Sequence, residues 1–526
     1  MNPASVENMS RRTAFPHACF LIYYAPRRAA FPHALASLYY NVSSPLVRQM
    51  RRFLFLLFFL CAATFASAAE VASVPREVRA VWFTTISGLD WPSRPATDAA
   101  SAKRQQRELC RMLDQLQTIG INVVLFQTRL RATTAYPSAL EPYDGVFAGA
   151  PGRTPPYDPL RFALDECHKR GMELHAWVVA FPIGKDGTMK RLGNRGLAKM
   201  RPELCRRAGE EWYMNPALPA TADYLAKLCR EIVENYEVDG IHLDYIRYPE
   251  HTIPFRDDAD FRRLAPAGVS KSAWRKQNVD RCVKAVADAV KGVRPWVKLS
   301  CSPVGKYADL PRASSFGWNA RDAVSQDAQA WLAKGWMDWL FPMMYFDGRH
   351  FYPFLADWKE NEGPGRVIPG LGIYFLSPSE KNWNLHVVTR QMSVSRMMGL
   401  GGHAFFRTRF LLNDVKGLFS WLRTDFYARP ALVPPISPVA SDTSAAPAAP
   451  ELRVEREGKT LHFSWNAIMA TTPVHYRLYR LDAGRDAVVV ADRLTDTSFS
   501  LTPALPSLLH STYVLTAVDA YGRESL

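Results

Sequence analysis

The chain has 526 residues, of which 48% are hydrophobic and 12% aromatic, so it can bury more than one ordinary core. This composition excludes an intrinsically disordered protein. Lys and Arg outnumber Asp and Glu by 65 to 50, and the formal charge of +15 would suit nucleic acid, an anionic membrane or an anionic polymer. The charges are scattered, part of the excess precedes Phe53, and no nucleic-acid motif accompanies it, so we expect no nucleic-acid partner.

An export signal is the first clear local pattern. Arg51 and Arg52 precede the apolar run Phe53–Leu60, and Ala66-Ser67-Ala68 matches a signal-peptidase site. The run is too short to cross a bilayer comfortably. Residues 50–68 are therefore predicted to be a signal peptide, leaving a periplasmic or cell-surface protein with no stable membrane span.

Two other interpretations of this segment stay open. The segment could act as a signal anchor, or Cys61 could carry a lipid, although the preceding Phe59-Leu60 lacks the small residues that a lipoprotein site prefers. Residues 1–49 show no pattern and are left unassigned. Met50 is a better start for an exported protein, so the upstream stretch could reflect a wrongly assigned start.

Of the eight cysteines, six follow the signal and none forms a C-x-x-C pair. Most fall on apolar faces of predicted helices, where a buried free thiol is usual, although one disulfide is possible in an oxidising compartment. We expect no metal site and no cofactor.

Residues 76–430 alternate short apolar runs with longer amphipathic stretches, which is typical of repeated βα units and a parallel sheet. The predicted strands are 78–84, 121–127, 172–180, 240–244, 297–303, 339–345, 367–375 and 402–406. The predicted helices include 101–118, 159–170, 221–236, 271–293 and 323–334. This number of strands over about 350 residues predicts an α/β fold of the (β/α)8 TIM-type barrel class. An open doubly wound sheet is the alternative, but no Gly-rich phosphate loop follows the first strand.

After Arg429 the composition changes. Residues 431–450 are rich in Pro, Ala and Ser and predict an extended linker. Residues 451–526 carry short alternating segments, about seven strands, with Trp465 as a core anchor. The fold class is thus completed by a small all-β immunoglobulin-like sandwich, which resembles a fibronectin type III domain.

In a barrel, the active site lies at the C-terminal ends of the strands. The predicted strand ends supply aromatic faces for pyranose rings together with polar groups for sugar hydroxyls. The candidates for substrate binding are Trp82, Gln127, Arg129, His175, Trp177, His242, Tyr245, Arg247 and Tyr345.

Several motifs of this barrel occur in a familiar order. They are Val78-Arg79-Ala80-Val81-Trp82, Tyr136-Pro137-Ser138, Leu174-His175-Ala176-Trp177, Asp239 to Tyr245 followed by Arg247-Tyr248-Pro249, and Gln326-Asp327. Together they resemble the glycosyl hydrolase-like barrel family that includes the divisome-localised glycosyl hydrolase of bacteria. The resemblance covers about residues 76–425 and implies an exported enzyme that cleaves peptidoglycan strands stripped of their stem peptides. One departure is Pro342-Met343-Met344-Tyr345, where the family leads us to expect an amide side chain.

Glycosidic cleavage needs two carboxyl groups, about 5–5.5 Å apart for retention or roughly 6.5–9.5 Å for inversion. Asp244, at the end of an apolar strand, is the first candidate, with a structural Asp bonded to Arg247 as the alternative. Asp347 and Glu141 are the first candidates for the second catalytic group, although Glu141 could instead fix its own loop. Asp309, Asp158 and Glu380 are further candidates.

The binding candidates have structural alternatives too. Arg129 and Arg247 could bind a substrate carboxylate such as a lactyl group, or form ion pairs with Asp244 or Glu141. His175 and His242 could bond sugar hydroxyls or sit satisfied in the core. Each of the aromatic candidates could equally be a core residue.

We therefore expect a glycoside hydrolase whose partner is a polysaccharide, first of all cell-wall glycan. A hydrolase of dietary or host polysaccharide and a non-catalytic glycan-binding barrel are the alternatives. An adhesion protein acting through the sandwich is a further one.

Overall fold

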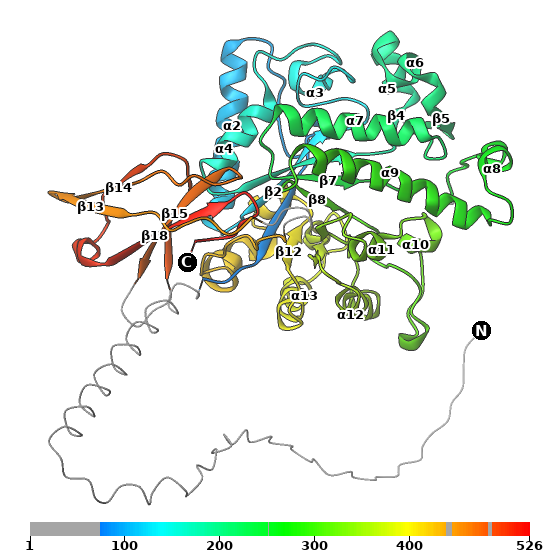
Figure 1. The fold of residues 1–526 in the computed structure, drawn as a ribbon. Coiled ribbons are helices and arrows are strands. Elements are labelled where there is room, and N and C mark those ends of the chain that lie inside the picture. Colours follow the sequence, from blue (N-terminus) through cyan, green and yellow to red (C-terminus); the bar gives the residue numbers. More distant parts are fainter. Residues whose placement is uncertain (1–73, 251, 438–443, 482–486, 526) are drawn as a thin grey trace, which may run out of the picture. The chain divides into compact units, whose positions relative to one another are not determined.

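The computed structural model describes residues 74–250, 252–437, 444–481 and 487–525 (Figure 1). The predicted signal peptide and the stretch before it lie outside the described residues. Two kinds of secondary structure follow one another along the described chain: a helix-rich barrel, then two small antiparallel sheets.

A parallel sheet forms the centre of the barrel. Its strands are β1 (Val78–Phe83), β2 (Val123–Arg129), β3 (Glu173–Val179), β7 (Gly240–Asp244), β8 (Lys298–Cys301), β9 (Trp339–Leu340), β10 (Arg366–Val367), β11 (Gly370–Leu371) and β12 (Gly402–Phe405). β1 pairs with both β2 and β12, so the first and last strands are neighbours. Every residue of β1, β2, β3 and β7 is buried, because helices cover one face of the sheet and the barrel interior the other.

β10 and β11 are two parts of one extended segment that closes the barrel. β10 pairs with β9, β11 pairs with β12, and a parallel bridge joins Met343 to Gly370. The segment therefore acts as the seventh of eight strand positions, and the predicted (β/α)8 class is confirmed.

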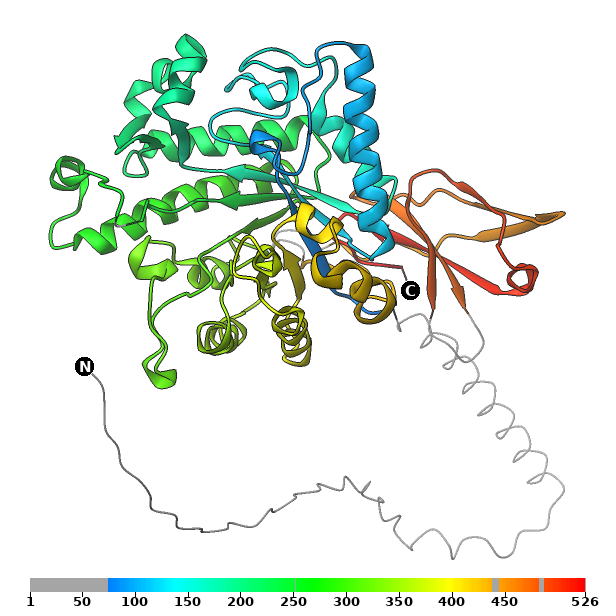
Figure 2. The same ribbon diagram turned by 180° about the vertical axis from the view of Figure 1, so that it is seen from behind.

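Helices surround these strands, as Figure 1 and the view from behind in Figure 2 show. The longer ones are α2 (Ala99–Thr118), α4 (Pro159–His168), α7 (Pro219–Asn235), α9 (Lys271–Val293), α12 (Tyr352–Glu360) and α13 (Leu385–Met397). Asp98 caps α2 by accepting from the Ser101 N–H, and Asp158 caps α4 ahead of a proline at the first helical position. The predicted helix 323–334 is wrong in its extent: it is divided into α10 (Ala320–Ala323) and α11 (Ala328–Ala333).

An insertion that the sequence did not predict follows β3. It holds an antiparallel sheet of β4 (Pro182–Lys185), β5 (Cys205–Ala208) and β6 (Glu211–Met214), with short helices α5 (Asp186–Leu192) and α6 (Leu197–Met200). Because it comes after the C-terminal end of a barrel strand, it builds part of the rim where catalytic residues are expected. Further short helices on that rim are α3 (Gly145–Ala148) and α8 (Asp258–Leu264), and α14 (Thr408–Leu412) and α15 (Leu418–Trp421) follow β12.

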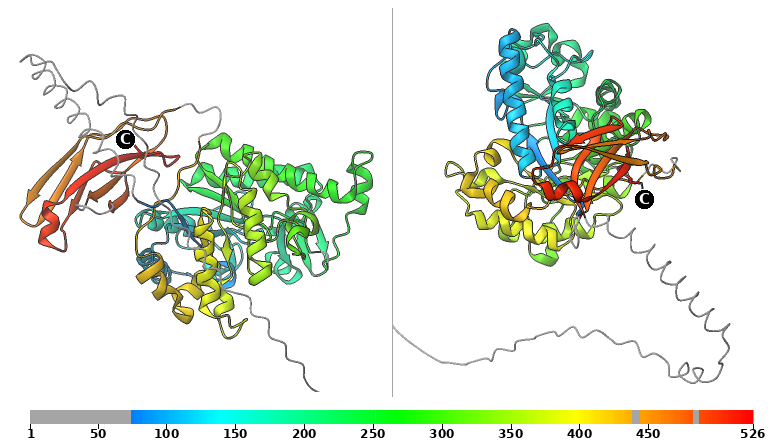
Figure 3. Two further views of the ribbon diagram at one scale, coloured as in Figure 1. Left: turned by 90° about the horizontal axis from the view of Figure 1, so that it is seen from below. Right: turned by 90° about the vertical axis from the view of Figure 1, so that its left-hand side faces the viewer.

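The C-terminal region is a small sandwich of two antiparallel sheets, seen as separate layers in Figure 3. One sheet contains β13 (Leu452–Glu457), β14 (Thr460–Trp465) and β17 (Ser498–Leu501), and the other β15 (Val474–Leu481), β16 (Val488–Leu494) and β18 (Thr512–Asp519). Trp465 packs in its core, 5.3 Å from the Tyr476 ring centre. The sandwich class is confirmed, while the closer likeness to fibronectin type III stays a prediction.

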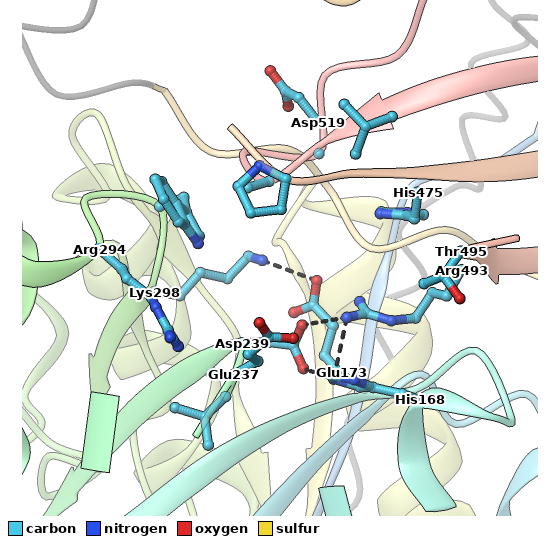
Figure 4. A pocket seen from close by; sticks show the side chains of 16 residues that line it. His168, Glu173, Glu237, Asp239, Arg294, Lys298, His475, Arg493, Thr495 and Asp519 are labelled. Atoms are coloured by element: carbon cyan, nitrogen blue, oxygen red, sulfur yellow. Dashed lines mark hydrogen bonds and ion pairs between the residues drawn. The ribbon is translucent and has the colours of Figure 1, made fainter. Parts of the chain in front are cut away.

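Charged side chains join this sandwich to the N-terminal ends of the barrel strands (Figure 4). Arg493 donates a 2.7 Å hydrogen bond to Asp239, which precedes β7, and Asp239 also lies 2.8 Å from His168 Nε2. Beside them Lys298 is 2.9 Å from Glu173. Burial alone would raise the pKa of Asp239, but the charge of Arg493 and that of His168 hold it well below its ordinary value. The cavity of about 200 Å³ here is lined by residues of both the barrel and the sandwich, and Asp239, Glu173, Lys298 and Arg493 in its lining form ion pairs with one another or with His168.

Candidate active site

Asp244 is the centre of the polar groups at the C-terminal end of the barrel. It ends β7, is 5% exposed, and accepts three hydrogen bonds. Ser302 Oγ donates to Oδ1 at 2.9 Å, the backbone N–H of Tyr245 donates to Oδ1 at 2.8 Å, and Trp177 Nε1 donates to Oδ2 at 3.1 Å. Two of these donors, Trp177 and Ser302, come from the strand positions on either side of β7, so the sheet helps to fix the orientation of the carboxylate.

Burial raises the pKa of Asp244 above its ordinary value, while the hydrogen bond from Ser302, the charge of Arg247 and the other two donors partly offset that rise. A raised pKa brings a carboxyl group closer to neutral pH, where it can give or take a proton. No metal-binding cluster of three or more His, Cys, Asp or Glu side chains occurs in the described part of the chain.

Tyr245, next to Asp244, has a left-handed backbone with φ of 51° and is 38% exposed. Left-handed conformations cost free energy in residues other than glycine and cluster at functional sites. Here the conformation turns the Tyr245 N–H back onto the Asp244 carboxylate and leaves the aromatic ring accessible at the rim.

Arg247 lies between two aromatic rings and forms no ion pair within the described residues. Its guanidinium carbon is 4.7 Å from the ring centre of Tyr245 and 5.3 Å from that of Trp318. Arg247 is 6% exposed, and within the described residues neither its Nε nor the indole Nε1 of Trp318 has a hydrogen-bond partner. Buried donors are normally satisfied, so these two unpaired N–H groups are exceptions beside the candidate site.

Tyr345 belongs to a cluster of aromatic side chains near Asp244. Its ring centre lies 5.8 Å from that of Tyr374 and 5.4 Å from that of Phe406, and all three side chains are partly exposed. Burial raises the pKa of Tyr345 well above its ordinary value, and the charge of Asp244 raises it further. Aromatic faces beside a buried carboxyl group suit a sugar ring.

Four of the predicted binding residues lie deeper than the rim. Trp82 and His242 are in the barrel interior, where Trp82 Nε1 donates to His242 Nε2 at 3.1 Å. An indole can only donate, so neutral His242 carries its proton on Nδ1 and gives it to Ser300 Oγ, 3.0 Å away. Burial lowers the pKa of His242 well below its ordinary value.

His175 and Gln127 are also buried. The ring centre of His175 lies 5.4 Å from that of Trp339, and the two rings are stacked. The side-chain oxygen of Gln127 accepts hydrogen bonds from the backbone N–H groups of Thr85 and Ile86.

Arg129 and Glu141 form a buried ion pair. The Arg129 Nε–Glu141 Oε2 distance is 2.7 Å and the Arg129 Nη2–Glu141 Oε1 distance is 2.5 Å, and both side chains have no exposed surface. Arg129 also donates to the backbone oxygens of Val179 and Ala180. The geometry therefore favours the structural alternative for both residues: they tie the loop after β2 to β3.

Asp347 follows β9 and is exposed, with Oδ1 accepting from the Gly348 N–H at 2.6 Å. Its other oxygen has room for solvent or substrate. Of the two first candidates for the second catalytic group, Asp347 is thus the accessible one.

Sequence reasoning did not single out Ser302, Trp318, Tyr374 and Phe406 as site residues. Ser302, Tyr374 and Phe406 were recognisable as strand-end positions, but nothing in the pattern showed that Ser302 bonds Asp244. Trp318 lies in the loop after β8, and only the fold brings it to Arg247.

The fold and this site define a glycosidase-type barrel with a buried carboxyl group and aromatic walls. The chain belongs to the family described as glycosyl hydrolase-like 10, whose model matches residues 77–368. It is similar to glycosyl hydrolase YngK of Bacillus subtilis, with 29% identity over 477 residues covering 86% of this chain and 93% of that protein. It is also similar to glycosyl hydrolase DigH of Escherichia coli K12, with 30% identity over 325 residues covering 58% of this chain and 74% of that protein.

Among solved structures, the glycoside hydrolase domain of PgaB (BpsB) from Bordetella bronchiseptica aligns with a TM-score of 0.46 and 13% identity. The alignment covers 66% of this chain and 98% of that domain. The family membership confirms the resemblance to a glycosyl hydrolase-like barrel and implies a polysaccharide substrate. Within the described residues, no helix has the length and apolar character needed to cross a bilayer.

Proposed function

We propose that this protein is an exported glycoside hydrolase that cleaves glycosidic bonds in peptidoglycan glycan strands. The observation that carries the proposal is Asp244: a buried carboxyl group at the end of a barrel strand, oriented by three donors and faced by aromatic side chains. Export rests on the predicted signal peptide, so the location of the protein is part of this proposal, as is its substrate. The six described cysteines are free.

In the proposed mechanism Asp244 is one member of the carboxyl pair and Asp347 is the other. Trp177 and Ser302 keep Asp244 from rotating while charge develops on the sugar, which preserves the alignment of the reacting groups. Tyr345 and Tyr245 pack against sugar rings, and Arg247 with Trp318 donates to oxygen atoms of the substrate. Glu141 is not used, because its oxygens are taken by Arg129.

The test is digestion of purified peptide-free glycan strands by residues 69–526, with products identified by mass spectrometry. Wild type is expected to release soluble oligosaccharides, and Asp244→Asn to release them at least about a thousandfold more slowly. Asp223→Asn is the matched control, since Asp223 is an exposed aspartate on the outer helix α7.

Three results would redirect the proposal. Release of products only from other polysaccharides would favour the dietary or host alternative. Binding of strands without any product, unchanged by Asp244→Asn, would establish a non-catalytic barrel. Equal rates for wild type and Asp244→Asn would remove Asp244 from the mechanism.

A further inference from the structure

A cavity of about 500 Å³ lies on the rim of the barrel, between the loops that follow β1, β2 and β3. Ile86, Leu130, Val146 and Leu192 give it an apolar lining, and Arg131, Lys185 and Arg191 line it with positive charge. Because all three loops follow C-terminal strand ends, the cavity is on the same side of the barrel as Asp244.

The described lining of this cavity has three cationic side chains and one carboxylate, so its net charge is positive. Lys185 and Arg191 are exposed and form no ion pair there, and Arg131 has only a long contact of 3.7 Å with Glu211. The cavity's own carboxylate, Asp144, is already used: Thr133 Oγ1 donates to it at 2.7 Å and the Val146 N–H at 2.9 Å. A concave surface whose net charge is positive concentrates anionic ligands.

Arg131 connects this cavity to the catalytic rim. Burial raises the pKa of Tyr245, the charge of Asp244 raises it further, and the charges of Arg247 and Arg131 lower it. Arg131 directly follows β2, so it lies at the same end of the barrel as Asp244 and also lines the cavity.

We infer that this cavity is a subsite for a sugar residue that carries a carboxylate. The apolar lining packs against the pyranose ring, and Arg131, Lys185 and Arg191 bind the carboxylate by charge-assisted hydrogen bonds. The inference rests on the proposed glycosidase function and assigns its specificity to residues outside the catalytic centre. A lactyl ether and a hexuronic acid carry the same chemical group, and the experiment separates them.

The experiment measures binding by calorimetry in an Asp244→Asn background, so that no ligand is consumed. Three oligosaccharides of equal length are compared: peptide-free strands with lactyl groups, oligogalacturonate, and neutral chitin oligomers. The added variant is Lys185→Gln/Arg191→Gln, and the control is Lys199→Gln, an exposed cation of the same insertion that does not line the cavity. Thermal unfolding checks that every variant is folded.

The double variant is expected to weaken binding of a carboxylated oligosaccharide about tenfold and to leave chitin oligomers unaffected. The carboxylated ligand that shows this loss identifies the source of the group, and rising salt should weaken its binding to the protein without the double substitution. Equal affinity for charged and neutral ligands, unchanged binding by the double variant, or no binding of any ligand would overturn the subsite. If wild type cleaves nothing but the charge-dependent binding persists, the hydrolase proposal fails and the subsite stands.

Discussion

Trp177 Nε1 lies 3.1 Å from Oδ2 of Asp244, so the third barrel strand holds the carboxylate that ends the fourth. Together with Ser302 on the next strand position, this contact means that the candidate catalytic group is fixed from both sides. The orientation of Asp244 is therefore a property of the sheet and does not depend on loop closure.

Substitution Ser302→Ala should move the pH profile of activity. The hydrogen bond from Ser302 lowers the pKa of Asp244, so its loss raises that pKa. The limb of the kcat/KM profile that reports Asp244 should therefore shift toward higher pH. Ser300→Ala is the control, because Ser300 bonds His242 instead. An unshifted limb in Ser302→Ala would mean that Asp244 does not titrate in the reaction.

Asp347→Asn tests the second carboxyl group. If Asp347 protonates the leaving oxygen, cleavage of natural strands should fall about a hundredfold or more, while aryl glycosides with acidic leaving groups should lose little activity. Steady-state kinetics on both substrates gives the comparison. Full activity of Asp347→Asn on natural strands would exclude Asp347 as the second carboxyl group, and the other carboxylates on the rim would then be tested.

Glu141→Gln should act on stability. The pair with Arg129 has no exposed surface, so removal of one charge leaves the other buried and unpaired, at a cost of roughly 3–5 kcal/mol in the free energy of unfolding. Urea unfolding measures this loss. The double variant Arg129→Met/Glu141→Leu should recover most of it, since neither charge then remains. A Glu141→Gln protein as stable as wild type but inactive would restore Glu141 as a catalytic candidate.

Arg493→Ala should destabilise the protein although Arg493 is in the sandwich. It leaves Asp239 partly unpaired, which we expect to cost roughly 2–4 kcal/mol at neutral pH. Because the pKa of Asp239 is lowered in the folded protein, this contribution is present above the ordinary aspartate pKa and is lost as the pH falls through the lowered value. The difference in urea stability between wild type and Arg493→Ala should accordingly shrink in acid. The exposed Arg453 gives the control substitution Arg453→Ala, and an equal loss in both variants would contradict the pairing.

The barrel was predictable because its strands are apolar on both faces, so each strand appears in the sequence as a short continuous run of apolar residues. The insertion after β3 was not, because its antiparallel strands are short and interrupted by charged residues such as Arg206 and Arg207. Asp244 was found from its place at a strand end. The role of each neighbour was harder to predict: His175 and Trp177 share a side of β3, yet one stacks in the interior and the other reaches Asp244.

Arg129 and Glu141 are a second case in which the sequence could not show whether a residue is structural or functional. Twelve positions separate them in sequence, and either could have faced a substrate. Only the path of the loop after β2 brings them together and closes the pair off from solvent. Spacing alone cannot distinguish a buried ion pair from two functional groups on a rim.

The contact between Arg493 and Asp239 also places the sandwich at the end of the barrel opposite to Asp244. Asp239 and Asp244 stand at opposite ends of one strand, about 16 Å apart along the chain direction. A ligand held by the sandwich would thus be held behind the barrel, away from the bond being cut. If the barrel cleaves a glycan as proposed, the sandwich is placed to hold the protein near that glycan and not to deliver the glycan to Asp244.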